Sequence, residues 1–338
     1  MNVDIHSHVI PMAFVDAVRA APVEYATRIE TRGGREHVVH DQGYVYPLFA
    51  EFCDPSAKLA SMDRRGIDVS IVSPAPPTFF YWAPGALGLK VARMVNDGIA
   101  AFVAQAPERL RPMGTLPLGD PALAVNELER IVREHGFRAI EVGTSIEGTL
   151  LSDPRYAKVL ERCAELGVFV FTHPYYVGAR CGMECFYLTN LLGNPWDTTL
   201  MASNLLLDGT LDRLPALELC LAHAGGFLPY QIGRLAHGHA VRTETRSATP
   251  HSPRTQLRRF HFDSMTFDPT ALTFLMNLVG SDRICLGTDD PFDMSEADPV
   301  GLIGKVAGAT DHDRHLMCGH NALRLLGESA TSRHGATP

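Results

Sequence analysis

The sequence has no hydrophobic run long enough to cross a membrane. A spanning helix needs about 18 or more consecutive apolar residues, and no stretch of the 338 residues provides them. The N-terminus, MNVDIHSHVIP, also lacks the basic start and apolar segment of a secretory signal peptide. Both absences predict a protein with no membrane partner.

Positive charge is also in short supply. The chain has 30 Lys and Arg against 38 Asp and Glu, a formal net charge of −8, and no block of five like charges. Proteins that bind nucleic acids need a basic surface for the phosphate backbone, so we expect no nucleic-acid partner. A small anionic substrate would need local positive charge from a metal ion or a few arginines.

Cysteine offers no disulfide framework. The seven cysteines are odd in number and scattered, and Cys220 and Cys285 lie inside apolar runs, where a buried free thiol is the usual interpretation. This usage is typical of a reducing compartment and predicts a cytoplasmic protein.

Short apolar runs recur along the chain, each followed by a helix-like stretch. Continuous apolar runs are expected of parallel strands that are buried on both faces. The clearest helices, 121–136 and 153–167, end in glycine. No glycine-rich phosphate loop follows a strand, which argues against an open doubly wound sheet, so we predict an α/β fold of the closed (β/α)₈ TIM-barrel type. The predicted strands are 3–6, 69–73, 111–116, 138–143, 168–173, 217–223, 259–264 and 283–289.

Residues 1–327 are predicted to form this barrel as a single catalytic domain. The polar stretch at 28–36 predicts a small hairpin inserted after the first strand, within about residues 20–50. The loop 174–200 carries several aromatic residues and is expected to build a pocket, whereas 242–258 is expected to be a mobile loop or a subunit contact. Residues 328–338 are expected to form a disordered tail.

Five polar residues fall where predicted strands end. His6 and His8 end the first strand, His173 the fifth and His223 the sixth, and Asp289 follows the eighth. All strand C-termini of a parallel barrel open on one face, and residues i and i+2 of a strand point the same way. Imidazoles and a carboxylate suit a cation such as Zn²⁺. Each residue alone has a structural explanation, such as a core histidine or a helix cap, but the joint pattern predicts a metal site.

The segments around these positions resemble the amidohydrolase superfamily. More closely, they resemble its branch of aminocarboxymuconate-semialdehyde decarboxylase and related decarboxylases. The similarity extends from residue 1 to about 327 and includes stretches such as CDP (53–55) and GTLPL (114–118). The motifs that carry it are DIHSH (4–8), THP (172–174), AHAGG (222–226), FDS (262–264) and GTDDPF (287–292).

The resemblance implies a metal-dependent barrel enzyme with a defined ligand set. His6, His8, His173 and Asp289 are expected to bind one divalent metal ion, Zn²⁺, with Mn²⁺ as an alternative. His223 is expected to act as the catalytic acid and base, with Asp289 as a second proton carrier. From its position, Asp263 is expected to hold a loop or to orient a histidine, and Asp290 to cap a helix or support the ligands.

The resemblance also implies substrate contacts. Arg234 and Arg242 match family arginines, and the first is donated to the substrate of the neighbouring subunit, so a homodimer is expected. Phe186 falls where the decarboxylase carries a pocket tryptophan, and Trp82, in an aromatic cluster after the second strand, either lines the pocket or only packs. Tyr46 replaces an arginine that binds a substrate carboxylate. A phenol supplies neither charge nor a bidentate fork, so we expect a different substrate.

The expected activity is therefore Zn²⁺-dependent, nonoxidative decarboxylation of a small unsaturated or aromatic carboxylic acid. The alternative is metal-dependent hydrolysis of a lactone, an amide or a cyclic carbonyl compound, which uses the same ligands. The fourth strand offers Glu141 but no lysine to bridge two metal ions, which favours a single ion.

Overall fold

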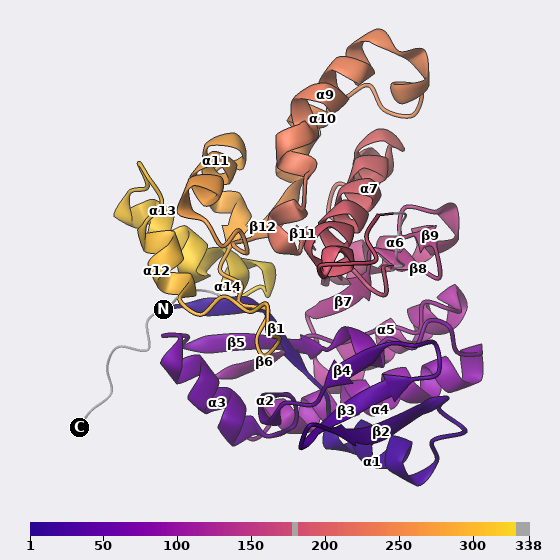
Figure 1. Cartoon of the computed structure of the whole chain (residues 1–338). Coiled ribbons are helices and arrows are strands. Elements are labelled where there is room, and N and C mark those ends of the chain that lie inside the picture. Colours follow the sequence, from indigo (N-terminus) through magenta and orange to yellow (C-terminus); the bar gives the residue numbers. More distant parts are fainter. Residues whose placement is uncertain (178–181, 329–338) are drawn as a thin grey trace.

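The computed structural model describes residues 1–177 and 182–328 (Figure 1). Eight parallel strands form two hydrogen-bonded groups, β1-β5-β6 and β7-β10-β11-β12-β13. Their bounds are β1 Val3–Val9, β5 Val69–Pro74, β6 Leu110–Pro112, β7 Ala139–Gly143, β10 Phe169–His173, β11 Leu219–Leu221, β12 Phe260–Asp263 and β13 Ile284–Cys285.

Two seams join these groups into a closed barrel. At one seam Gly114 bridges to Ile140, and the backbone N–H of Glu141 donates to the Gly114 carbonyl at 2.8 Å. At the other, Ser7 bridges to Asp290, and the backbone N–H of His8 donates to the Asp290 carbonyl at 2.8 Å. The (β/α)₈ barrel predicted from the alternating runs is confirmed.

Helices pack around the outside of this barrel. They begin where proline and a capping carboxylate favour a helix: the Asp120 side chain accepts hydrogen bonds from Ala122 N and Leu123 N, and Gly136 ends the same helix with φ 68°. The longer helices are α1 Met12–Ala20, α3 Pro55–Arg64, α4 Gly85–Val103, α5 Pro121–His135, α6 Ala157–Leu166, α7 Asn194–Leu207, α9 Leu228–Val241 and α11 Pro269–Val279. The shorter helices are α2 Ala50–Cys53, α8 Thr210–Arg213, α10 Pro253–Gln256, α12 Pro299–Gly304, α13 Asp311–His315 and α14 Asn321–Leu325.

The barrel interior is filled by apolar side chains rather than open. Ile5, Ile71, Phe171 and Cys285 belong to one buried cluster, and α14 adds Leu323. A second, larger cluster lies between the sheet and the surrounding helices. No helix in the described part of the chain combines the length and the hydrophobicity needed to cross a bilayer.

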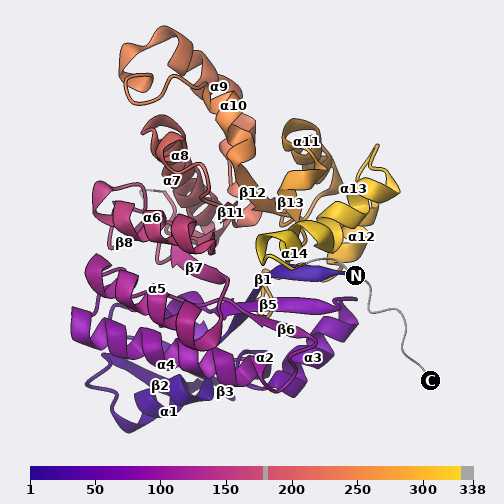
Figure 2. The ribbon, with the colours of Figure 1, turned by 180° about the vertical axis from the view of Figure 1, so that it is seen from behind.

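Two segments extend beyond the barrel. A three-stranded antiparallel sheet, β2 Thr27–Arg32, β3 Arg35–His40 and β4 Val45–Pro47, forms the predicted insertion, and Gly33 and Gly34 adopt the positive φ of its tight turn. In both Figure 1 and Figure 2, α9 extends away from the barrel as an arm. The segment 242–258 follows this arm and contains α10.

At the C-terminus, Glu328 is the last described residue, and its carboxylate accepts a hydrogen bond from Arg111 Nε at 2.6 Å. The rest of the predicted tail, 329–338, lies outside the described residues.

The inserted sheet gives a pH prediction through His40. This imidazole is buried between the rings of Tyr46, Tyr176 and Phe80. The Thr27 hydroxyl donates to Tyr25 O, so His40 Nδ1 donates to Thr27 Oγ1 at 3.1 Å, and Nε2 has no hydrogen-bond partner among the described residues. Burial lowers the pKa of His40 from 6.5 to about 4.

The unfolded chain therefore takes up a proton at His40 below pH 6.5, whereas the folded chain resists it until about pH 4. As the pH is lowered from 6.5 to 4, we expect His40 to reduce the free energy of unfolding by on the order of 3 kcal/mol. A His40→Gln variant should lose less stability than the native protein between pH 6.5 and 4 in denaturant titrations. Equal acid losses in the two proteins would contradict the prediction.

Candidate metal centre and active site

The four predicted ligands converge at the C-terminal end of the barrel. The ligand atoms of His6, His8, His173 and Asp289 all lie within 4.8 Å of one another, and all four side chains are buried. His8 Nε2 lies 3.0 Å from Asp289 Oδ1 and 3.1 Å from His6 Nε2. The distant parts of the chain are brought together because β1, β10 and the segment after β13 open on one face.

Hydrogen bonds fix the tautomers of these imidazoles. His6 Nδ1 donates to Asp263 Oδ2 at 2.7 Å, and His173 Nδ1 donates to the Pro174 carbonyl at 2.8 Å. His173 Nε2 is buried and has no hydrogen-bond partner in the described part of the chain. The proton on each Nδ1 leaves the Nε2 lone pair to face the cluster, which is the arrangement of a metal-ligating histidine.

His8 is oriented in the same way from the other side. The Ser73 hydroxyl donates to Ser7 O, so His8 Nδ1 donates to Ser73 Oγ at 3.2 Å, and Glu141 Oε2 lies 3.5 Å from the same nitrogen. Glu141 thus lies behind the ring, away from the Nε2 atom that faces the cluster. This position supports the interpretation that Glu141 does not bridge two metal ions.

Charge balance also fits a cation. Asp289, Asp263 and Glu141 are all buried, and within the described ranges neither lysine nor arginine forms an ion pair with any of them. Burying an uncompensated carboxylate costs several kcal/mol, by an order-of-magnitude estimate. A divalent cation would offset two of the three negative charges, so the donor set and its charge both fit a metal ion. The role of the four residues as ligands stays a prediction.

The pKa shifts follow from the same geometry. Burial lowers the pKa of His6, but the charges of Asp289 and Asp263 outweigh burial and hold this pKa well above its usual value. Burial and the nearby imidazoles of His223 and His6 push the pKa of His173 well below its usual value. His173 therefore keeps a free lone pair at neutral pH. Burial raises the pKa of Asp289, yet the surrounding imidazoles lower it well below its usual value, so the carboxylate stays ionised.

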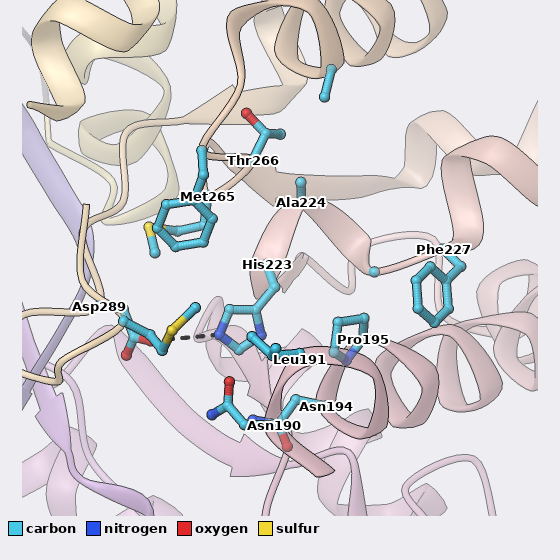
Figure 3. A pocket seen from close by; sticks show the side chains of 14 residues that line it. Asn190, Leu191, Asn194, Pro195, His223, Ala224, Phe227, Met265, Thr266 and Asp289 are labelled. Atoms are coloured by element: carbon cyan, nitrogen blue, oxygen red, sulfur yellow. Dashed lines mark ion pairs between the residues drawn. The ribbon is translucent and has the colours of Figure 1, made fainter. Parts of the chain in front are cut away.

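His223 stands beside this cluster rather than in it. Its Nε2 lies 3.6 Å from Asp289 Oδ2 (Figure 3), and its ring centroid lies 5.0 Å from that of His173. His223 and Ala224 adopt φ angles of 53° and 54°, in the left-handed region. For residues other than glycine this backbone conformation costs of order 1–3 kcal/mol each. Asp263 holds this turn, because its carboxylate accepts from His223 N at 2.9 Å and Ala224 N at 2.7 Å. Asp263 therefore both orients a histidine and holds a loop, as its position predicts.

A buried charge network supports the loop that carries Asp289. The Asp290 carboxylate accepts from Lys58 Nζ and from the Ser61 hydroxyl, both at 2.8 Å, and pairs with Arg65 at 3.0 Å. Its carbonyl also accepts the backbone N–H of His8. The network locks the Asp289 segment onto β1, so Asp290 supports the ligands. Sequence reasoning missed Lys58, which lies on the buried side of α3 beside Ser61 and Met62.

Two cavities meet at His223 and Asp289. The smaller, about 320 Å³, is mainly apolar and is lined by residues such as Leu191, Phe227 and Met265 (Figure 3). The larger, about 700 Å³, extends toward the inserted sheet and is walled by aromatic and polar residues. The residues that line both cavities are Asn190, Asn194, Met294, His223 and Asp289.

The five predicted substrate contacts are placed differently. Tyr46 lines the larger cavity and lies 6.5 Å, ring to ring, from Phe292, which in turn lies 5.3 Å from His8. Trp82 lines neither cavity and packs on Phe80 at 4.9 Å.

The other three predicted contacts are exposed. The Phe186 side chain is 87% exposed in the loop after β10, Arg234 projects from the α9 arm, and Arg242 pairs with Glu244 at the end of that arm. None of the three lines either cavity of a single chain.

Comparison with known proteins agrees with this geometry. The family model described as amidohydrolase matches residues 3–327. The chain is 30% identical over 329 residues to 2-amino-3-carboxymuconate-6-semialdehyde decarboxylase of Dictyostelium discoideum, covering 97% of this chain and 92% of that one.

Solved structures share the fold. The apo IDCase of Metarhizium anisopliae superposes with a TM-score of 0.84 at 23% identity, covering 97% of both chains. A dihydroxybenzoic acid decarboxylase of Polaromonas sp., solved with manganese and an inhibitor, gives a TM-score of 0.78 at 24% identity, covering 96% of both chains.

Asp263 offers a direct test of the metal centre. We expect the native protein to bind one divalent cation per chain, and Asp263→Asn to weaken that binding about 10- to 100-fold, because the variant loses the charge that orients His6. Competition with a chelator, using Zn²⁺ and Mn²⁺ in turn, measures the affinity.

The matched control is Asp268→Asn, in the same loop. Asp268 also accepts backbone N–H groups, from Thr270 and Ala271 at the start of α11, but touches no ligand. It should bind the cation like the native protein. Equal affinity in the native protein and the Asp263 variant would refute the orienting role.

Proposed function

The chain belongs to the amidohydrolase family, and on that premise we propose that it is a metal-dependent, nonoxidative decarboxylase of a small aromatic or unsaturated carboxylic acid. The observation that carries the proposal is the position of His223, which faces both cavities beside the four-residue cluster. The similarity to a decarboxylase over 97% of the chain supports it.

We propose Zn²⁺ as the resident ion, because three imidazoles and one carboxylate are ligands that zinc favours. Manganese is the alternative, supported by its presence in the Polaromonas structure. A bound divalent cation supplies Lewis-acid stabilisation of the negative charge that develops on the substrate.

The chain's own residues then handle the proton. An imidazole can donate a proton and take it back at the same nitrogen, and His223 Nε2 is open to the cavities next to the ionised Asp289. We propose that His223 protonates the carbon that bears the carboxylate. The carbon–carbon bond then breaks, its electron pair returns to the substrate skeleton, and CO₂ leaves. No oxidant is needed, because the proton replaces CO₂ at the same carbon.

The aromatic wall of the larger cavity suits a planar acid. Tyr46 and Phe292 lie between the inserted sheet and the cluster, and Tyr176 lies 5.9 Å from Tyr46. Burial raises the pKa of Tyr46, so this phenol stays neutral and offers a second carboxylate a hydrogen bond but no counter-charge. These features support a substrate other than aminocarboxymuconate semialdehyde.

We also propose a homodimer. Apolar side chains are exposed on neighbouring helices around the arm, including Trp196 at 44%, Tyr230 at 81% and Phe274 at 47%. Arg234, on the same arm, pairs with no described residue and lines no cavity of its own chain. Both facts support the proposal that Arg234 reaches the active site of a second subunit. The six described cysteines are all free, which supports the expected cytoplasmic location.

The activity is tested by incubating metal-loaded protein with salicylate-like and muconate-like acids while CO₂ release is measured. His223→Ala should keep its metal content and lose about 10²- to 10⁴-fold in kcat, because the proton donor is gone. His237→Ala, on the exposed arm, is the control and should retain native activity.

Near-native turnover by the His223 variant would eliminate its acid role. Turnover of lactones or amides in a parallel panel, with no CO₂ from any acid, would replace the decarboxylase with the hydrolase.

The shared site predicts complementation between inactive variants. Arg234→Ala and His223→Ala homodimers should each be largely inactive. A purified heterodimer of the two should regain about half the native activity, because one of its two sites then has both its own histidine and the partner's arginine.

The reciprocal heterodimer is the control. Pairing a native subunit with one that carries both substitutions should give little activity, since the intact His223 then faces a partner that lacks the arginine. Half activity in this control and none in the first heterodimer would show that Arg234 acts within its own chain.

A further inference from the structure

Two asparagine side chains occupy the junction of the two cavities. Asn190 lies in a π-helical turn, Thr189–Gly193, that continues directly into α7, where Asn194 is the first residue. The two are four residues apart on one helical segment and therefore share a face. Both line both cavities, beside His223 and Asp289 (Figure 3).

Neither side-chain amide hydrogen-bonds to a described residue, although both residues are half-buried. Three other helical asparagines do form such bonds, whereas Asn126 and Asn277 form none with a described residue but are exposed to solvent. Asn96 donates to Thr115 O and Glu127, Asn204 donates to Leu200 O, and Asn321 donates to Ser281 O and Ile284 O. Two unused amides at one junction leave several donors and acceptors free in the site.

The surroundings favour an uncharged partner for these amides. Leu191, Pro195, Phe227 and Met265 line the smaller cavity beside them, and within the described ranges no lysine or arginine lines it. A second carboxylate placed here would lose its hydration without gaining a counter-charge. A hydroxyl group both donates and accepts hydrogen bonds, as a side-chain amide does. It can therefore bond to these amides without burying a charge.

We propose that Asn190 and Asn194 form an amide pair that recognises an uncharged hydroxyl group of the substrate. The substrate group that these amides hold is then an uncharged hydroxyl group rather than a second carboxylate. The proposal rests on the proposed function, since it takes the junction to be the place where the acid binds. A site built to bond a hydroxyl group disfavours the analogue that lacks it, because the amides would be left unpaired.

The test is calorimetric binding of three probes to metal-loaded, full-length protein: benzoate, 2-hydroxybenzoate and benzene-1,3-dicarboxylate. We expect the native protein to prefer 2-hydroxybenzoate over benzoate by about tenfold, the value of one net hydrogen bond, and to bind the dicarboxylate more weakly than either. Asn190→Leu and Asn194→Leu should each remove most of that preference and change benzoate affinity by less than about twofold.

The control is Asn204→Leu, in the same helix α7. The Asn204 amide is bound to Leu200 O and lines neither cavity, so the preference should remain. Asn194→Asp provides a variant of nearly identical shape. Its carboxylate should weaken all three acids at least about tenfold by repulsion at close range.

Equal weakening of benzoate and 2-hydroxybenzoate in the leucine variants would overturn the amide pair, as would an unchanged preference. If the three acids bind Asn194→Asp as tightly as they bind the native protein, the residue 194 side chain lies away from the bound acid. That result would also overturn the amide pair. A native protein that binds both benzoates equally refutes the amide pair alone. A native protein that binds no acid refutes the proposed function as well.

Discussion

The charge balance of four buried ligand-type side chains is the constraint on which the rest of this structure depends. Three imidazole nitrogens and one carboxylate oxygen lie within 4.8 Å of one another in a buried space. Hydrogen bonds at the far side of each ring hold the lone pairs inward instead of letting the rings turn away. A bound divalent cation would stabilise such a cluster. Because the proposed ligands come from β1, β10 and the segment after β13, its binding energy would also tie together opposite parts of the barrel.

The positions of His223 and Asp289 depend on strained backbone conformations as well as on buried charges. Asp289 and His223 both adopt positive φ, at 59° and 53°, which turns each side chain from its strand toward the shared centre. Two buried carboxylates offset that cost. Asp263 accepts backbone N–H groups at the His223 turn, and Asp290 joins Lys58 and β1 beneath the Asp289 segment. Hydrogen bonds to charged groups contribute about 1.5–3 kcal/mol each, comparable to the strain they hold.

Patterns within short segments reveal the ligands but not the groups that hold them. His6 and His8 can be predicted because a two-residue spacing on a strand defines a common direction. The strand predicted at 217–223 ends at Leu221, because Asp263 captures the backbone N–H of His223 and folds the next residues into a turn. That contact spans 40 residues, and the Lys58–Asp290 pair spans 232, so no local pattern carries either.

The surroundings of residues in the loop after β10 and on the α9 arm cannot be predicted from sequence for a different reason. Phe186 and Arg234 match family positions, yet within one chain both are exposed. In the proposed homodimer their surroundings would include a second subunit, which the fold of one chain does not describe. Asn190 and Asn194 are ordinary helical asparagines in sequence. Only the packing of α7, which continues the π-helical turn, against the His223 turn places both amides at the junction of the cavities.

The distribution of charge is the physical basis for proposing an acid other than the substrate named for the Dictyostelium relative. The protein carries a net charge of −8, and the floor of its site contains three buried carboxylates. A metal ion held by the proposed ligands would therefore supply the positive charge nearest to His223, where the proposal places the reacting carboxylate. The phenol of Tyr46 and the amides at the junction are neutral, and Arg35, in the wall of the larger cavity, stacks over Phe49 at 4.6 Å. If the acid binds as proposed, its specificity depends on these neutral groups and on the lack of a lysine or arginine among the described residues that line the smaller cavity.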